Sequence, residues 1–253
     1  MELNHKTFGQ GEPLVILHGL FGTLDNWQTM ARRFAENYTV ILVDQRNHGR
    51  SPHLPGHSYE LLANDLKEFL EANWIYEANI LGHSMGGKTA MQFAMDFPDM
   101  VEKLVVVDMG IKEYPAGHNE IFEALFSLDV SKLESRSVAQ KHLVSKINNL
   151  GVVQFLMKNL SRKKEGGFQW KMNLQALYEN YEKILSPIEG TAYDDEALFV
   201  RGGTSHYVKD EDWGAIQQLF PNSKLVTIDG AGHWVHAVAP DALYTAIMGF
   251  LEE

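Results

Sequence analysis

The stretch Ile80-Leu81-Gly82-His83-Ser84-Met85-Gly86-Gly87 decides the fold of this chain. An apolar run precedes it and helix-compatible spacing follows it, so the chain must turn sharply from a strand into a helix with Ser84 at the apex. Side chains at Gly82 and Gly86 would collide with neighbouring backbone on so tight a turn. The stretch therefore predicts an exposed serine hydroxyl beside a helix N-terminus, whose free N–H groups favour developing negative charge.

Compact apolar runs on both sides of this turn suit strands that are buried on both faces. They cover residues 14–17, 39–43, 78–81, 104–107, 197–200 and 224–228. Amphipathic helical patterns separate most of these runs; Ser58 is a plausible N-cap for one of them, and Pro240 suits the first turn of another. The alternation predicts an α/β fold with a mostly parallel central sheet flanked by helices.

Polar residues follow directly after several of the predicted strands. His18, Asp44, Ser84 and Asp108 each come at the end of such a run. In a parallel sheet, the chemistry gathers at the carboxyl ends of the strands. These four side chains are therefore expected at one rim of the molecule.

The alternation of strands and helices stops between residues 111 and 186, where the sequence has helical patterns and no convincing β run. We expect an all-helical lid inserted between two strands and folded over the rim. The domain prediction is accordingly a core of residues 1–110 and 187–253 and a lid of residues 111–186. Most lid aromatics would pack the lid onto the core, and a few would line an apolar acyl pocket.

Composition limits the possible partners of the chain. The 253 residues carry a formal net charge of −11, which argues against nucleic acid or an anionic membrane surface as the main partner. There is no cysteine, and no third ligand joins His233 and His236 at a useful spacing, so we expect neither a metal nor a cofactor. The N-terminus lacks the pattern of a signal peptide, which favours a cytoplasmic protein. The oligomeric state is left open.

Four motifs together resemble the α/β-hydrolase superfamily. They are HG-x-x-G at residues 18–22, D-x-R-x-H-G-x-S at 44–51, the G-H-S-M-G-G turn, and G-A-G-H at 230–233. More narrowly, the stretches HGLFG, VDQRNHGRS, VVDMG and VRGG-x-S-x-Y are similar to those of the bacterial YbfF-type esterases. The resemblance implies a serine carboxylesterase for short to medium acyl esters, and a possible acyl-CoA thioesterase activity for which the basic residues 162–164 would supply a phosphate site.

The predicted chemistry needs a base for the serine, because a free serine hydroxyl is a poor nucleophile at neutral pH. Ser84 and His233 fit as nucleophile and base in the chain order of this superfamily, which is serine, acid, histidine. His233 follows the last predicted strand, and small residues before it would let the loop bend toward the serine turn.

The acid of the triad is the unusual case. Most members of the superfamily carry it after the strand at 197–200, where this sequence has Ser205 in place of aspartate. A serine cannot supply the negative charge that stabilises an imidazolium. We expect Asp108, after the preceding strand, to take this role, with Asp210 and Asp229 as alternatives, and Ser205 to add a hydrogen bond to the Asp108–His233 pair.

Acyl transfer also requires an oxyanion hole. The expected donors are the backbone N–H groups of Met85, directly after the nucleophile, and of Leu20, in the loop after the first buried strand. Phe21 would then form a wall of the acyl site.

Two other functions fit the same motifs. Some enzymes of this fold use a serine to hydrolyse C–C bonds, and some members are ligand-binding proteins with little turnover. An intact triad argues against the second, and labelling by a serine-directed probe would separate a catalytic from a non-catalytic protein.

Overall fold

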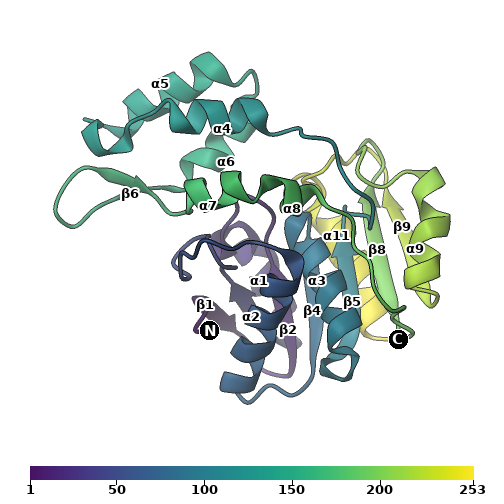
Figure 1. The fold of residues 1–253 in the computed structure, drawn as a ribbon. Helices are drawn as coiled ribbons and strands as arrows, with labels where there is room; N and C mark the ends of the chain where they lie inside the picture. The colour runs from purple at the N-terminus through teal and green to yellow at the C-terminus, as the bar shows by residue number, and fades with distance from the viewer.

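The computed structural model describes residues 1–253 and has one large sheet of seven strands in the order β1-β3-β2-β4-β5-β8-β9 (Figure 1). The strands are β1 (His5–Phe8), β2 (Glu12–Leu17), β3 (Tyr38–Val43), β4 (Ala78–His83), β5 (Val101–Val107), β8 (Ala197–Gly202) and β9 (Ser223–Ile228). All neighbours run parallel except β1, which pairs antiparallel with β3. The predicted α/β fold with a mostly parallel sheet is confirmed.

Helices cover both faces of this sheet. They are η1 (Leu24–Trp27), α1 (Gln28–Phe34), α2 (Tyr59–Ala72), α3 (Met85–Asp96), η2 (Pro98–Met100), η4 (Asp210–Asp212), α9 (Trp213–Leu219), α10 (Val235–Val238) and α11 (Pro240–Leu251). Successive strand residues point to opposite faces, so Ile80 joins the core under α2, α3 and α9, whereas Leu81 joins the core under α1 and α11. This double burial explains the continuous apolar runs in the sequence.

Two predicted helix starts are present in the structure. The Ser58 side chain caps α2 by accepting a hydrogen bond from the backbone N–H of Leu61 at 3.4 Å. Pro240 is the first residue of α11, where its missing N–H costs nothing. By contrast, the edge strand β1 is not evident in the sequence, because its residues HKTF are largely exposed and form no apolar run.

The prediction that the inserted segment, residues 111–186, is all-helical is wrong, because the segment also contains two short strands. Its elements are α4 (Asn119–Phe126), η3 (Val130–Lys132), α5 (Arg136–Lys146), α6 (Leu150–Met157), β6 (Leu160–Arg162), β7 (Phe168–Trp170), α7 (Leu174–Glu179) and α8 (Tyr181–Leu185). β6 and β7 pair antiparallel and form a hairpin that projects from the segment (Figure 1). Strands of three residues are too short to show an alternating pattern, and Gly166 and Gly167, at φ 99° and 76°, allow the tight turn.

The inserted segment lies over the carboxyl ends of the sheet strands (Figure 1). Its buried side chains, including Phe122, Leu156 and Leu177, belong to the same apolar cluster as those under α2 and α3. Polar contacts add to this packing: the Asn159 side chain donates to the Phe21 carbonyl at 2.6 Å, and the Asn173 N–H donates to the Asn47 carbonyl at 2.8 Å.

Both ends of the inserted segment converge on Lys88, a residue of α3 that is fully buried. Its ammonium donates to the Lys112 carbonyl at 2.8 Å on one end and to the carbonyls of Leu185 and Ser186 on the other. The Tyr114 ring lies 4.9 Å from the same nitrogen. Lys88 therefore connects the core to both ends of the inserted segment.

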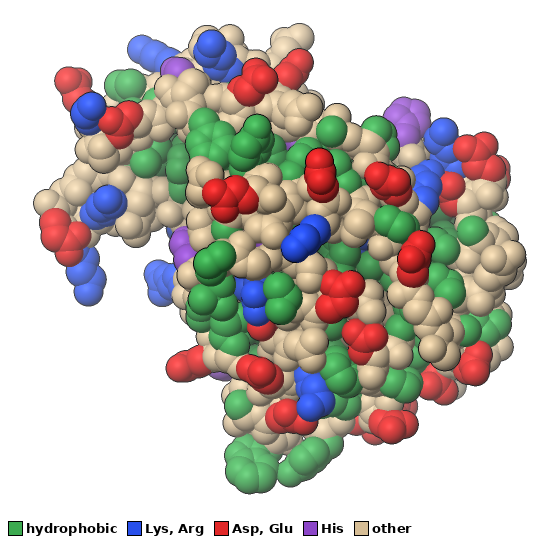
Figure 2. All heavy atoms as spheres, in the orientation of Figure 1, with side chains coloured by type: hydrophobic (Ala, Val, Ile, Leu, Met, Phe, Trp, Pro, Cys, Tyr) green, Lys and Arg blue, Asp and Glu red, His purple; other side chains and the backbone are tan.

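Charged side chains of both signs are interspersed on the face drawn in Figure 2, with no large basic patch on it. None of the helices combines the length and the apolar composition required to cross a lipid bilayer.

Candidate active site

The turn between β4 and α3 holds Ser84 in a strained conformation, with φ 54° and ψ −122°. A Cβ on Gly82 would lie 2.0 Å from the Gly86 carbonyl oxygen, and a Cβ on Gly86 would lie 2.4 Å from the Leu17 carbonyl oxygen. The two flanking glycines are thus required by backbone contacts, as the sequence pattern suggested. The turn that holds Ser84 therefore packs directly on the end of β2.

Ser84, His233 and Asp108 form one hydrogen-bonded chain. The Ser84 hydroxyl lies 3.0 Å from His233 Nε2, and His233 Nδ1 lies 2.7 Å from Asp108 Oδ2. A carboxylate can only accept, so Nδ1 carries the ring proton and Nε2 is free to accept the serine proton. The three residues follow β4, β9 and β5 respectively, so parallel strands bring them to one rim.

Asp108 is fully buried and has a positive φ of 50°. Its Oδ1 accepts a hydrogen bond from the Gly202 N–H at 2.9 Å, and its Oδ2 accepts one from the Ser205 hydroxyl. The side chain of Asp210 is 90% exposed and pairs with Arg201, and Asp229 is also exposed. Of the three candidate acids, only Asp108 contacts His233.

The loop after β8, where the sequence has no aspartate, still reaches the site. Ser205 donates to Asp108, and the Tyr207 ring stacks on the His233 ring with centroids 3.8 Å apart and planes 15° apart. The Tyr114 hydroxyl in turn donates to the Tyr207 carbonyl at 2.8 Å. The sequence placed Tyr207 in the VRGG-x-S-x-Y stretch but gave it no role, and its position two residues after Ser205 was the available signal.

The backbone N–H groups beside Ser84 separate into paired and free donors. The Gly22 N–H donates to the Gly19 carbonyl at 2.9 Å, and the Phe21 N–H donates to His48 Nε2 at 3.2 Å. The N–H groups of Leu20 and Met85 make no hydrogen bond within the protein. Met85 is the first residue of α3, where no intrahelical acceptor exists. These are the two donors that the sequence suggested for an oxyanion.

A buried polar network supports the loop that carries Leu20. The Gln45 N–H donates to His18 Nε2 at 3.1 Å, and the Asp44 carboxylate accepts from the Leu24 N–H at 2.8 Å. Burial lowers the pKa of His18, and it lowers that of His48 further, so both rings are neutral acceptors at neutral pH. These residues connect the loop after β2 to the loop after β3, and they have no direct role in the proposed chemistry.

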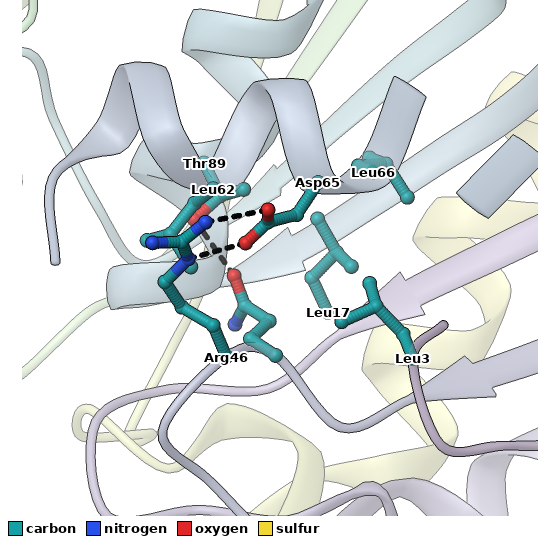
Figure 3. A pocket seen from close by; sticks show the side chains of 8 residues that line it. Leu3, Leu17, Arg46, Leu62, Asp65, Leu66 and Thr89 are labelled. Atoms are coloured by element: carbon teal, nitrogen blue, oxygen red, sulfur yellow. Dashed lines mark hydrogen bonds and ion pairs between the residues drawn. The ribbon is translucent and has the colours of Figure 1, made fainter. Parts of the chain in front are cut away.

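Beneath this network, Arg46 pairs with Asp65 of α2 through two hydrogen bonds (Figure 3). The cavity next to this pair has a volume of about 10 Å³, space for about one water molecule. It is too small for a substrate, and the pair instead anchors the loop after β3 to α2.

The cavity that contains Ser84 and His233 has a volume of about 850 Å³. Apolar side chains from the core and from the inserted segment line much of it, among them Leu20, Phe21, Trp27, Met30, Ile121, Val152, Phe155, Trp234 and Val238. Phe21 is buried at its wall, and its ring packs on that of Phe122 at a centroid distance of 5.2 Å. The basic residues 162–164 are not part of this lining.

Two further histidines lie behind His233. His83 Nε2 donates to the His233 carbonyl at 2.9 Å, and the ring of His236 stacks on Trp27 at 4.6 Å. Burial lowers the pKa of His236 to about 4 and that of His83 well below its usual value, so both stay neutral. No group of three or more His, Cys, Asp or Glu side chains is arranged to hold a metal ion.

Comparisons with known proteins give matches over nearly the whole chain. A family model described as the alpha/beta hydrolase fold matches residues 12–240. The chain is 38% identical to the esterase YbfF of Escherichia coli, over 95% of this chain and 93% of that protein. It is also 38% identical to the mouse sn-1-specific diacylglycerol lipase ABHD11, over 94% of this chain and 80% of that protein. A solved structure titled marine microorganism esterase superposes with a TM-score of 0.96 at 42% identity, covering 98% of this chain and 99% of that one.

Proposed function

The chain belongs to the α/β-hydrolase family and is a hydrolase that acts on esters, and within this class we propose that it is a serine carboxylesterase working through an acyl-enzyme on Ser84. The observation that carries the proposal is the hydrogen-bonded chain from Ser84 through His233 to Asp108. It supplies a nucleophile, a base and a buried negative charge in the order that acyl transfer requires.

In the first half of the reaction, His233 Nε2 takes the Ser84 proton while the serine oxygen attacks the ester carbonyl. Asp108 stabilises the imidazolium, and the free N–H groups of Leu20 and Met85 donate to the oxyanion. The tetrahedral intermediate then collapses. The C–O bond to the alcohol breaks, and the alcohol oxygen leaves with the proton held by His233.

In the second half, His233 takes a proton from water, and the resulting nucleophile attacks the acyl carbon bound to Ser84. The second tetrahedral intermediate uses the same two N–H donors. Its collapse releases the carboxylic acid and returns the proton to Ser84 Oγ, so His233 is neutral again at the end of the cycle.

The cavity supports a small to medium acyl group. Its volume of about 850 Å³ and its apolar walls suit an ester with a short or medium chain. We further propose that residues 111–186 act as a lid over the core of residues 1–110 and 187–253, because this segment supplies a large part of the cavity wall. Residues 162–164 are absent from the cavity lining, so they give no support to acyl-CoA thioesters as substrates.

A rate panel tests the proposal. Initial rates would be measured for p-nitrophenyl esters of increasing acyl length and for the matching acyl-CoAs, with the wild-type protein and Ser84→Ala. We expect ester hydrolysis with a maximum at short to medium length and a loss of at least about 10³-fold in Ser84→Ala.

A fluorophosphonate probe separates this proposal from the alternatives. It should label the wild-type protein but not Ser84→Ala, whereas Ser137→Ala, which removes an exposed serine of α5, should be labelled like the wild type. A folded protein whose Ser84 is not labelled, or ester turnover that survives Ser84→Ala, would contradict an acyl-enzyme on this residue.

A further inference from the structure

His118 is a histidine of the inserted segment that lines the same cavity as Ser84 and His233. It lies directly before α4, and its ring packs edge-on against the Phe21 ring with centroids 5.9 Å apart. His142, the other histidine of the segment, does not line the cavity. The mechanism above uses Ser84, His233 and Asp108 but gives His118 no role.

The hydrogen bonds around Tyr181 fix the tautomer of His118. The Tyr181 hydroxyl oxygen accepts from the N–H of Gly117 at 3.2 Å and from the N–H of His118 at 3.0 Å. These two bonds occupy both lone pairs of the oxygen, so the hydroxyl proton is donated to His118 Nδ1, 2.7 Å away. Nδ1 is therefore an acceptor, and the ring proton is on Nε2.

The His118 ring is neutral at neutral pH, because burial and the nearby His233 lower its pKa to about 4. Its Nε2–H has no hydrogen-bond partner in the protein, and this atom is not among the fully buried unpaired ones. A neutral donor with a fixed direction thus stands in a largely apolar cavity. Polar groups of this kind orient the ligand in such sites.

We propose that His118 Nε2–H is a specificity donor that binds an uncharged ether or hydroxyl oxygen in the alcohol part of the substrate ester. The inference rests on the proposed function. The leaving oxygen receives its proton from His233, so the alcohol part of the ester must lie next to His233, in the cavity that His118 also lines. The preferred substrates are then esters of alcohols with a second oxygen a few bonds from the leaving oxygen.

A pair of esters of equal shape tests this donor. 2-Methoxyethyl butanoate and butyl butanoate differ by one oxygen in place of a methylene, and the ratio of their kcat/KM values reports the bond to that oxygen. Intrinsic reactivity cancels when the ratio is compared between variants. In His118→Phe we expect the ratio to fall about three- to tenfold, while kcat/KM for the butyl ester falls less. His118→Gln, which keeps an N–H donor near the same place, should retain part of the preference.

A second pair of variants tests the tautomer. Tyr181→Phe removes the hydroxyl that donates to Nδ1 and should lower the ratio, whereas Tyr178→Phe, an exposed tyrosine of α7, should not. Nitrogen-15 NMR of the histidine rings should find the Nε2–H form of His118 in the wild-type protein.

An unchanged ratio of the two kcat/KM values in folded His118→Phe would overturn the inference, and so would an Nδ1–H tautomer of His118. In either case ester hydrolysis would still depend on Ser84, so the proposed function would stand. Failure of the proposed function has a different signature. Both esters would then be hydrolysed equally well by the wild type and by Ser84→Ala, and that result would overturn both proposals.

Discussion

Asp108 shows what a single residue needs in order to act as the acid of this site. It follows β5, and its positive φ turns the carboxylate toward His233 and toward the loop after β8. Three hydrogen bonds, from Gly202, Ser205 and His233, hold the two carboxylate oxygens. The sequence could place several aspartates near the rim, but only the fold decides which carboxylate reaches His233.

The Asp108→Asn variant tests this assignment. The amide would keep the shape but would lose the negative charge and favour the wrong tautomer of His233, so kcat should fall by about 10³- to 10⁴-fold. The variant should still fold, as measured by circular dichroism and thermal unfolding. Asp229→Asn, at an exposed aspartate after β9, is the matched control and should keep wild-type turnover. Turnover of Asp108→Asn near the wild-type level would exclude Asp108 as the acid.

Among the elements, the inserted segment and the core are joined by buried hydrogen bonds from α2 and α3. Lys88 reaches from α3 to carbonyls on both ends of the segment, and the Tyr59 hydroxyl of α2 donates to the Ile184 carbonyl. Burial lowers the pKa of Lys88 to about 7, and the negative charge of Glu113 opposes this shift. The rings of Tyr59 and Tyr114 lie 5.6 and 4.9 Å from the Lys88 nitrogen. The helices of the core and the insertion are therefore joined by one buried lysine.

Replacement of Lys88 should loosen the junction. Lys88→Met keeps a similar length but leaves buried carbonyls without a donor, which should reduce the free energy of unfolding by about 1–3 kcal/mol. Urea unfolding would measure this loss, and limited proteolysis should show faster cleavage near residues 111–113 and 185–187. Lys146→Met, at an exposed position of α5, should change neither quantity. If Lys88→Met and the wild type had the same free energy of unfolding and the same rate of proteolysis, the hydrogen bonds of Lys88 would not be needed to hold the junction together.

Across the whole molecule, several histidines are buried or half-buried in neutral form. Burial lowers the pKa of His57 to about 3 and those of His118 and His236 to about 4, and it lowers those of His48 and His83 well below the usual value. In the unfolded chain each would titrate near 6.5. Between the two values the unfolded state binds more protons than the folded state, so stability must fall as the pH falls.

We therefore expect the free energy of unfolding to decrease between pH 6.5 and about pH 4, by several kcal/mol in total. Urea unfolding across this range would measure the slope, above the pH at which most carboxylates titrate. His57→Leu removes one buried titrating ring and should make the slope shallower, whereas His142→Leu, at a half-exposed position of α5, should not. A free energy of unfolding that stays constant over this interval would contradict the burial of neutral histidines.

The sequence by itself determined the order of the elements, the serine turn and the candidates for the site. These features are local: buried parallel strands need continuous apolar runs, and a Cβ at Gly82 or Gly86 would enter the backbone of a neighbour. The short strands β1, β6 and β7 have too few residues to form a recognisable pattern, so the sequence did not predict them.

Only the tertiary structure decided the relations between distant residues. It brought Asp108 rather than Asp210 or Asp229 to His233, stacked Tyr207 on that ring, and placed Lys88 between the two ends of the insertion. The sequence identified Ser84, His233, Leu20 and Met85 as candidates for one active site. The distance of 3.0 Å between Ser84 and His233, however, depends on the register of the whole sheet. The physical reason is that strand order and loop packing are long-range properties, set by burial across the entire core, which no local pattern records.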